Sequence, residues 1–246
     1  MSDWIFGINP VREALSGRRR RPLELFLARE GNARLQELAA AAEQAGVSVR
    51  RCARAELERL TGGARHQGAA LRLEPFAYVE LADLLAASRK DEKPGFLLAL
   101  DGITDPHNLG ALVRSAAAAG CQGVILPKDN SCPVTAVVDR AAAGSLEHIP
   151  LCRVVNLART LDELKQAGFW VHGLAGEGDQ DLFCADLSGP LVLVAGSEGS
   201  GLRPNVRRHC DVLLSIPMGG GVGSLNVSVA TGIALFEVLR QRRLSP

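Results

Sequence analysis

Residues 216–230, I-P-M-G-G-G-V-G-S-L-N-V-S-V-A, are the stretch that decides the fold. The apolar run from Val212 to Ile216 predicts a buried strand. Glycines at 219, 220, 221 and 223 follow, where the backbone can approach a ligand closely or adopt a positive φ. Beyond Ser224, a plausible N-cap, apolar residues recur at helical spacing as far as Val238. We therefore expect a strand, a glycine loop and a helix, a geometry that often presents backbone N–H groups to a polar ligand.

Two familiar glycine-rich loops do not match this stretch. A phosphate-binding P-loop ends in Gly-Lys-Ser/Thr, whereas this loop ends Gly223-Ser224-Leu225. A dinucleotide fingerprint needs G-x-G-x-x-G, whereas Gly219-x-Gly221 continues to Ser224. Taken alone, the loop could equally be a structural turn, so its meaning depends on the rest of the chain.

The overall composition is that of a soluble globular protein of one or two domains. The chain has 246 residues, of which 47% are hydrophobic and 22% charged, with a net charge of +1. The charge is unevenly distributed, because residues 1–75 carry a net +4 and residues 76–246 a net −3. A basic N-terminal region on an acidic body is expected to meet an anionic partner.

The cysteines and the apolar segments indicate the cellular compartment in which the protein is expected. Six cysteines are scattered without metal-ligand spacing, which predicts reduced core thiols and no metal site. The sequence carries no pattern of a signal peptide and no apolar run long enough for a membrane span. We therefore expect a cytoplasmic protein that does not enter the membrane.

The pattern of elements predicts an α/β protein with two domains. A small α/β domain is expected over residues 1–75, a connector over 76–95, and a larger domain over 96–246 in which strands alternate with helices. Such alternation indicates a parallel sheet with both faces covered. In the first domain we expect strands at 23–28, 47–51 and 69–73 and helices at 10–15, 32–45 and 55–60. In the second we expect strands at 96–100, 123–126, 170–174, 191–195 and 212–216 and helices at 109–119, 134–143, 156–167 and 227–242.

The N-terminal domain offers two candidate contacts for RNA. Arg18, Arg19, Arg20 and Arg21 form a basic run, which could be a solvated loop or could contact phosphates. His66 precedes Gln67-Gly68 in a predicted loop, where an imidazole could hydrogen-bond to or stack on an unstacked base.

Three polar, glycine-rich loops follow strands of the predicted parallel sheet, whose carboxyl ends are where ligands bind. The loop after residue 100 carries Asn108, expected to cap a helix that bears Arg114. The loop after residue 195 carries Glu198, and the third is the stretch that begins at Ile216. Each could be a structural turn, but together they predict one ligand site.

These residues resemble the three motifs of the SpoU (TrmH) family of the SPOUT class, which are S-adenosylmethionine-dependent RNA 2′-O-ribose methyltransferases. The N-terminal Phe6-Gly7-x-x-Pro10-Val11 and His66-Gln67-Gly68 look like the substrate-binding domain of one branch, so the resemblance spans the chain. The motifs are Asp101-x-x-x-Asp105-Pro106-x-Asn108-x-Gly110-x-x-x-Arg114, then Gly196-x-Glu198-x-x-Gly201-Leu202, then Ile216-Pro217-Met218 with Ser224-Leu225-Asn226-Val227-Ser228-Val229-Ala230.

The resemblance implies a deep trefoil knot in the C-terminal segment, an exception to unknotted topology. It also implies that the protein is a homodimer and that Gly196, Ile216, Met218 and Leu225 line the S-adenosylmethionine site. The branch that it resembles methylates a guanosine ribose in 23S ribosomal RNA. A transfer RNA or another ribosomal site is the alternative substrate, and RNA binding without catalysis and a dinucleotide-dependent oxidoreductase are the rival functions.

For catalysis, the resemblance implies that Arg114 is the base that takes the ribose proton. Because a guanidinium group is effectively never deprotonated in proteins, Arg114 could instead stay charged, grip a phosphate and stabilise the developing oxyanion. Asn108 and Glu198 would then orient it, and Ser224 and Asn226 would hold the loop or the ribose. A purely structural role, as a cap or a loop-stabilising bond, stays open for Glu198 and Asn226.

Overall fold

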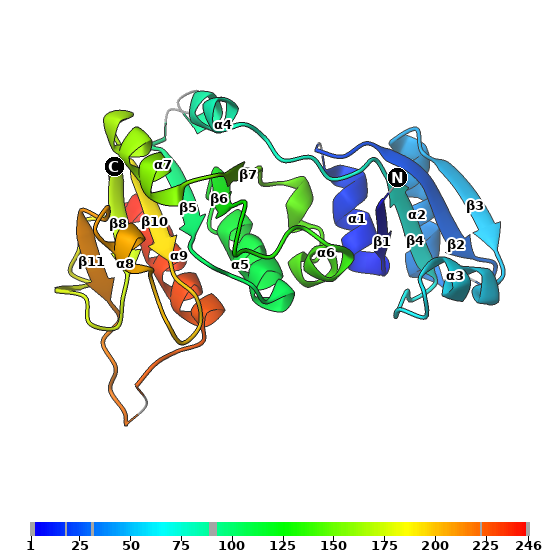
Figure 1. The fold of residues 1–246 in the computed structure, drawn as a ribbon. Helices are drawn as coiled ribbons and strands as arrows, with labels where there is room; N and C mark the ends of the chain where they lie inside the picture. Colours follow the sequence, from blue (N-terminus) through cyan, green and yellow to red (C-terminus); the bar gives the residue numbers. More distant parts are fainter. Residues whose placement is uncertain (1–2, 18, 31, 89–92, 222, 245–246) are drawn as a thin grey trace. The chain divides into compact units, whose positions relative to one another are not determined.

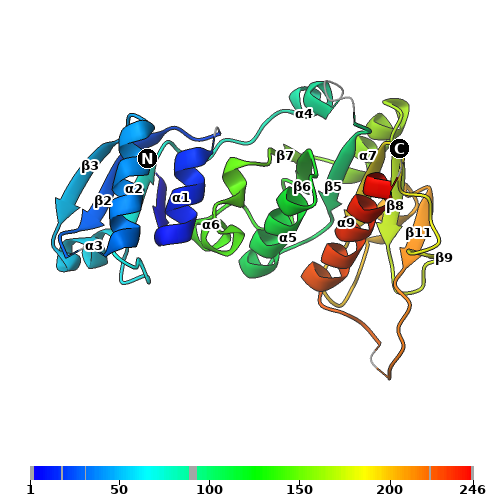
Figure 2. The same ribbon diagram turned by 180° about the vertical axis from the view of Figure 1, so that it is seen from behind.

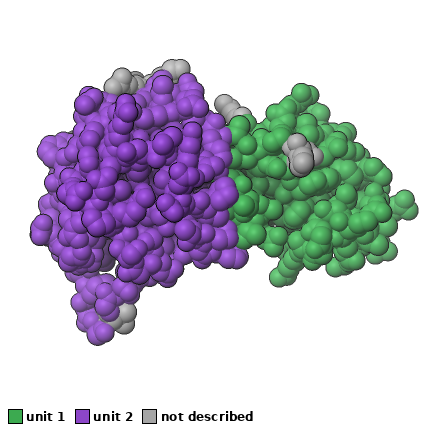
Figure 3. Space-filling view, viewed as in Figure 1, with its two compact units in different colours: residues 1–77, 134–148 green, residues 78–133, 149–246 purple. Residues whose placement is uncertain are grey.

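The computed structural model describes residues 3–17, 19–30, 32–88, 93–221 and 223–244. The chain divides into two compact units, coloured separately in Figure 3. Unit 1 contains residues 1–77 and 134–148, and unit 2 contains residues 78–133 and 149–246. None of the described helices combines the length and the apolarity needed to cross a bilayer.

Unit 1 is built on a four-stranded sheet with the order β1-β4-β2-β3 (Figure 1). Antiparallel pairing joins β1 to β4 and β4 to β2, whereas β2 and β3 are parallel. The strands are β1 (Asp3–Phe6), β2 (Pro22–Ala28), β3 (Ser48–Cys52) and β4 (Ala69–Leu73), and the helices are α1 (Ile8–Ser16), α2 (Ala33–Gln44) and α3 (Arg54–Leu60).

The sequence explains where the helices of unit 1 begin and what they bury. Asn32 caps α2 by accepting a hydrogen bond from the backbone N–H of Leu35. Leu35 and Leu38 on the inner face of α2 then pack into a core with Leu25 and Leu27 of β2. Burial of such leucine side chains contributes about 1.5–3 kcal/mol each, which is what holds this small sheet and its helices together.

Unit 1 also takes in a segment from the middle of the chain. Residues 134–148 form α6 (Ala136–Ala142) and a short 3-10 helix, η1 (Ser145–Glu147). Both elements carry buried acids, Asp139 and Glu147, which pair with the buried guanidinium of Arg20. Sequence periodicity predicts a helix at 134–143, and the sequence analysis placed it in the C-terminal domain. The structure places it in unit 1, where its buried acid pairs with Arg20. A partner more than a hundred residues away leaves no local signal in the sequence.

Unit 2 is built on a seven-stranded parallel sheet with the order β7-β6-β5-β10-β8-β11-β9. Its strands are β5 (Phe96–Leu100), β6 (Gly123–Pro127), β7 (Leu151–Val154), β8 (Trp170–Leu174), β9 (Gln180–Asp181), β10 (Leu191–Ala195) and β11 (Val212–Ser215). Its helices are α4 (Leu81–Ser88), α5 (Pro106–Ala118), α7 (Leu157–Gln166), α8 (Pro204–Arg207) and α9 (Val227–Leu244).

Helices cover both faces of this sheet, so its central strands are apolar at every position (Figures 1 and 2). On one face, α4, α7 and α8 pack against Leu97, Val192 and their neighbours in one core cluster. On the other face, α5 and α9 lie side by side (Figures 1 and 2). The predicted parallel α/β fold is confirmed, whereas the threading of a knot stays a prediction.

The sequence missed five short elements, β1, β7, β9, α8 and the 3-10 helix η1. Each has four residues or fewer, which is too short to show a strand or helix period. β9 pairs with β11, and α8 follows β10, two of the three strands whose ends build the site described next.

Candidate functional site

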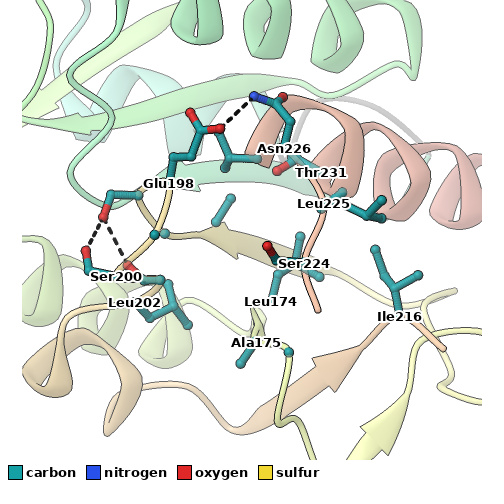
Figure 4. A pocket seen from close by; sticks show the side chains of 18 of the residues that line it. Leu174, Ala175, Glu198, Ser200, Leu202, Ile216, Ser224, Leu225, Asn226 and Thr231 are labelled. Atoms are coloured by element: carbon teal, nitrogen blue, oxygen red, sulfur yellow. Dashed lines mark hydrogen bonds between the residues drawn. The ribbon is translucent and has the colours of Figure 1, made fainter. Parts of the chain in front are cut away.

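The candidate site lies where three neighbouring strands end. β10, β8 and β11 are adjacent and parallel, so their carboxyl ends meet at one edge of the sheet. The segments that leave these ends line a cavity of about 750 Å³ (Figure 4). This volume lies within the range of roughly 300–1,000 Å³ that is typical of small-molecule sites.

All four residues that the sequence assigns to the cofactor line this cavity. They come from two loops, with Gly196 after β10 and Ile216, Met218 and Leu225 around the glycine stretch after β11. The proposed catalytic residues Glu198, Ser224 and Asn226 also line it, and Figure 4 shows Glu198 and Asn226 side by side.

Gly196 is needed because of the backbone around it. The loop after β10 folds back on itself, with Ser197 and Gly201 exchanging two backbone hydrogen bonds of 3.0 Å. A Cβ added at Gly196 would lie 2.1 Å from the carbonyl carbon of Gly201. A substitution there would thus deform the loop itself, rather than only fill the space intended for a ligand.

An ion pair between the buried Asp101 and the half-exposed Arg203 holds the end of this loop. The Asp101 carboxylate, with an exposed fraction of 0%, accepts hydrogen bonds from Nε of Arg203 at 2.6 Å and from its backbone N–H at 2.8 Å. The backbone N–H of Asp101 in turn donates to the carbonyl of Ala195 at 2.7 Å. Asp101 therefore ties the far end of the loop to the edge of the sheet.

A network of hydrogen bonds joins the three motifs. Asn108 donates from Nδ2 to the Glu198 carboxylate at 3.1 Å. Asn226 donates from Nδ2 to the Glu198 carboxylate and to Oδ1 of Asn108, both at 3.2 Å. The Ser228 hydroxyl adds a bond of 3.1 Å to Oδ1 of Asn108. The amide and carboxylate groups are therefore fixed relative to one another at the mouth of the cavity.

Two capping predictions are wrong. Asp105, not Asn108, caps α5, because its carboxylate accepts from the backbone N–H of His107 at 2.9 Å and Asn108 lies inside the helix. Asn226, not Ser224, occupies the start of α9, where its Oδ1 accepts from the backbone N–H of Ser228 at 2.9 Å. A capping role for Asn226, which the sequence analysis kept as an alternative, is thus present together with its bond to Glu198.

Arg114 lies apart from this network. It is the ninth residue of α5, is exposed, and does not line the cavity. Within the described part of the chain, no side chain pairs with its guanidinium group. The expectation that Asn108 and Glu198 orient Arg114 is therefore not met, since both bind Asn226 instead.

The sequence analysis missed two parts of the cavity wall. Residues 175–177 follow β8, and Glu177 forms an ion pair with Arg207 of α8 that lowers the pKa of the Glu177 carboxyl group. The signal was present, because Leu174 is followed by Ala-Gly-Glu-Gly, the same strand-then-glycine pattern as elsewhere. Thr231 of α9 gave no signal, because it sits inside a helical apolar pattern.

The cavity fits S-adenosylmethionine. Thr231 is fully buried beside it, and none of the described residues forms a hydrogen bond with its Oγ1, so a polar ligand atom would satisfy that group. Leu202, Leu214 and Ile216 supply apolar wall for an adenine ring. Glu198 supplies negative charge for a sulfonium cation.

Two of the N-terminal residues proposed to contact RNA, Arg20 and His66, are buried in the structure. Arg18 lies outside the described residues. Arg19 is partly buried, and burial lowers its pKa, while Arg21 is exposed. Arg20 is not available to phosphate, because it is 4% exposed and paired with acids. His66 is also buried, and its Nδ1 accepts from the backbone N–H of Gly68 at 3.1 Å, so its ring cannot stack on a base.

Comparison with solved structures defines the class. The fold resembles a SpoU methyltransferase, AviRb from Streptomyces viridochromogenes, in complex with AdoMet, with a TM-score of 0.79 and 26% identity over 99% of this chain and 91% of that one. It also resembles an AdoMet-bound rRNA methyltransferase from Sinorhizobium meliloti, with a TM-score of 0.78 and 29% identity over 97% and 87%. The fold and the cavity are those of an S-adenosylmethionine-dependent methyltransferase.

The family follows from the sequence. Residues 95–236 match the SpoU rRNA Methylase family, and residues 4–79 match the RNA 2′-O ribose methyltransferase substrate-binding family. The chain therefore belongs to the SpoU rRNA methylase family. It is 48% identical to the 23S rRNA (guanosine-2′-O-)-methyltransferase RlmB of Shewanella oneidensis over 98% of each chain. It is 46% identical to the protein of the same name from Escherichia coli K12 over 98% of this chain and 100% of that one.

Proposed function

We propose that the protein methylates the ribose 2′-oxygen of a guanosine in 23S ribosomal RNA. The observation that carries this proposal is the similarity to the RlmB proteins, which extends over nearly the full length of both chains, substrate-binding region included. A transfer RNA or another ribosomal site stays the alternative substrate. We also propose that the reaction takes place in the cytoplasm, which the six free cysteines support.

The chemistry divides between the cofactor and the protein. S-adenosylmethionine supplies the methyl group when bound. Transfer of this methyl group to the ribose 2′-oxygen would leave S-adenosylhomocysteine as the second product and release the hydroxyl proton to solvent. The protein therefore has to orient the ribose, hold the loops around the cavity and accommodate the negative charge that develops on the 2′-oxygen.

We infer that Asn108, Glu198 and Asn226 act as one positioning unit. Their hydrogen bonds connect α5, the loop after β10 and the start of α9. Removing any one of them would break two of the three bonds and leave only the bond between the other two. Ser224, which lines the same cavity, would contact the ribose or the cofactor loop.

Arg114 is proposed to be a charged clamp rather than a base. Its guanidinium group is exposed and unpaired among the described residues, so it is available to an incoming phosphate. An arginine can hold a phosphate with two parallel hydrogen bonds and stabilise an oxyanion without losing its proton.

The proposed assembly is a homodimer formed by unit 2. Two large apolar side chains on α9, Val229 and Phe236, are seven positions apart on one helix face and are 52% and 49% exposed. Apolar groups of this size at helical spacing suit the face of a second copy. The C-terminal knot implied by the family stays part of the proposal for this unit.

The proposed substrate can be tested with the purified protein and two RNA probes. A transcript of 23S ribosomal RNA and bulk transfer RNA are incubated with S-adenosylmethionine, and 2′-O-methylated positions are mapped at nucleotide resolution. We expect one guanosine of the 23S transcript to be methylated and the transfer RNA to stay unmodified. Methylation of transfer RNA alone, or of no guanosine in the 23S transcript, would contradict the proposal.

A further inference from the structure

Unit 1 contains a second cavity, of about 560 Å³, which the catalytic site does not use. It lies at the carboxyl ends of β2 and β3, which are parallel neighbours with Ala28 paired to Cys52 in the last register position. The segments that leave these two strands lead into α2 and α3. The residues that line the cavity are Ala28, Arg29, Glu30, Asn32, Leu35, Ala53, Arg54, Gln67 and Gly68.

A tight turn forms one wall of this cavity. Gln67 and Gly68 both have left-handed backbone conformations, with φ values of 53° and 86°. At Gly68 the positive φ favours glycine, and an added Cβ would lie 2.9 Å from Cδ1 of Leu35, so a larger residue would strain the turn and displace that side chain. Oε1 of Gln67 accepts from the backbone N–H of Ile8 at 3.2 Å, which holds its side chain in place. The turn and its side chain therefore form a fixed wall of the cavity.

The charged groups of the cavity suit a nucleotide. Arg29 and Arg54 are both exposed. Arg54 forms an ion pair with Glu58 at 3.7 Å, which is open to water and of little energetic value. These two guanidinium groups can contact phosphates. The carboxylate of Glu30 can accept hydrogen bonds from N–H groups on the edge of a base.

The size and the charge of the cavity together point to an unpaired nucleotide. Proteins that read single-stranded RNA take unstacked bases into such spaces and hold the flanking phosphates with arginines. A base inside a duplex is stacked and paired, so it cannot enter. Arg29 and Arg54 then account for part of the positive charge of residues 1–75 that can contact RNA, whereas Arg20 and His66 are buried.

We propose that the cavity between the ends of β2 and β3 receives one unpaired nucleotide of the RNA substrate, with Arg29 and Arg54 on its phosphates and Glu30 on its base. This proposal rests on the proposed function, because it takes RNA to be the substrate. The cavity belongs to the other compact unit from the cofactor cavity, so it contributes to RNA recognition and not to methyl transfer.

The test uses the full chain, because residues 134–148 complete unit 1 and a deletion of residues 1–75 would expose the buried Asp139 and Glu147. Binding is measured by fluorescence anisotropy with a labelled single-stranded oligoribonucleotide of mixed sequence and with a blunt duplex of the same sequence. We expect Arg29→Ala and Arg54→Ala each to weaken single-strand binding about tenfold. Each should also reduce the slope of log affinity against log salt by about 0.7, the value for one phosphate contact on a single strand.

Two further variants separate the cavity from general charge. Arg59→Ala removes an exposed arginine of the same helix that does not line the cavity, and it should change binding less than twofold. Ala53→Leu fills the cavity without changing any charge, at a position whose extended backbone accepts leucine. It should weaken binding of the single strand but not of the duplex.

The outcomes distinguish this proposal from the proposed function. Equal losses for Arg54→Ala and Arg59→Ala, together with no effect of Ala53→Leu, would overturn the cavity proposal even in an enzyme that methylates the 23S transcript. Selective losses for the cavity variants in an enzyme that does not methylate that transcript would support the cavity and overturn the proposed function.

Discussion

The ion pair between Asp101 and Arg203 should control both the stability of unit 2 and its affinity for the cofactor. Replacing Arg203 by Met keeps the length of the side chain but removes the two guanidinium contacts, from Nε and Nη2, each 2.6 Å from the carboxylate. Of its bonds to residue 203, the fully buried carboxylate of Asp101 would then keep the one from the backbone N–H.

The size of the effect follows from these contacts. Stripping one partner from a buried ion pair costs about 3–5 kcal/mol. The Arg203 side chain is 46% exposed, so water can reach part of the vacated space, and the lower end of that range, about 3 kcal/mol, is expected. With a urea dependence of about 3 kcal/mol/M, the unfolding midpoint of unit 2 should fall by about 1 M. Loosening of the loop 196–202 should also raise the Kd for S-adenosylmethionine about tenfold, equivalent to about 1.4 kcal/mol.

The assay can be confined to unit 2. Trp4 lies in unit 1 and Trp170 in unit 2, so a Trp4→Phe background makes tryptophan fluorescence report on unit 2. Calorimetric titration gives the cofactor affinity of the same proteins. Arg208→Met is the matched control, because Arg208 is exposed and its side chain bonds to its near neighbour Asn205. A midpoint shift below about 0.3 M and a Kd within twofold of the parent would refute the reasoning.

Three further predictions concern other parts of the molecule. Arg114→Lys should lower the single-turnover rate about a hundredfold at saturating cofactor and RNA if Arg114 is a charged clamp, whereas near-normal rates with a pH profile shifted downward would restore it as the base. Phe236→Glu should convert a dimer into a monomer in sedimentation at micromolar concentration, and a parent protein that is itself monomeric would contradict the proposed assembly. Burial lowers the pKa of His172 from its ordinary 6.5, so its contribution to stability is present above that pH and is lost as the pH falls. His172→Phe should therefore flatten the decline in unfolding free energy as the pH falls below about 6.5, and an unchanged slope would show that another group causes it.

Sequence patterns were sufficient for the parts of the protein that depend on near neighbours. The alternation of apolar strands with helices predicted the parallel sheet of unit 2, because strands buried on both faces must be apolar throughout. The glycine loop after β11 and Gly196 after β10 were found because each directly follows a strand. The family was identifiable for the same reason, since its motifs are local runs of residues.

Only the tertiary structure decided which of these residues meet. In the sequence, Arg20 is part of a basic run that suggests a surface. In the structure it is buried and pairs with two acids more than a hundred residues further along the chain. These acids belong to residues 134–148, which therefore pack as part of unit 1. The bond from Asn226 to Asn108 likewise spans 118 positions. A side chain's charge and local period show what it can do, whereas its partner is set by the order of strands in the sheet, which no local pattern contains.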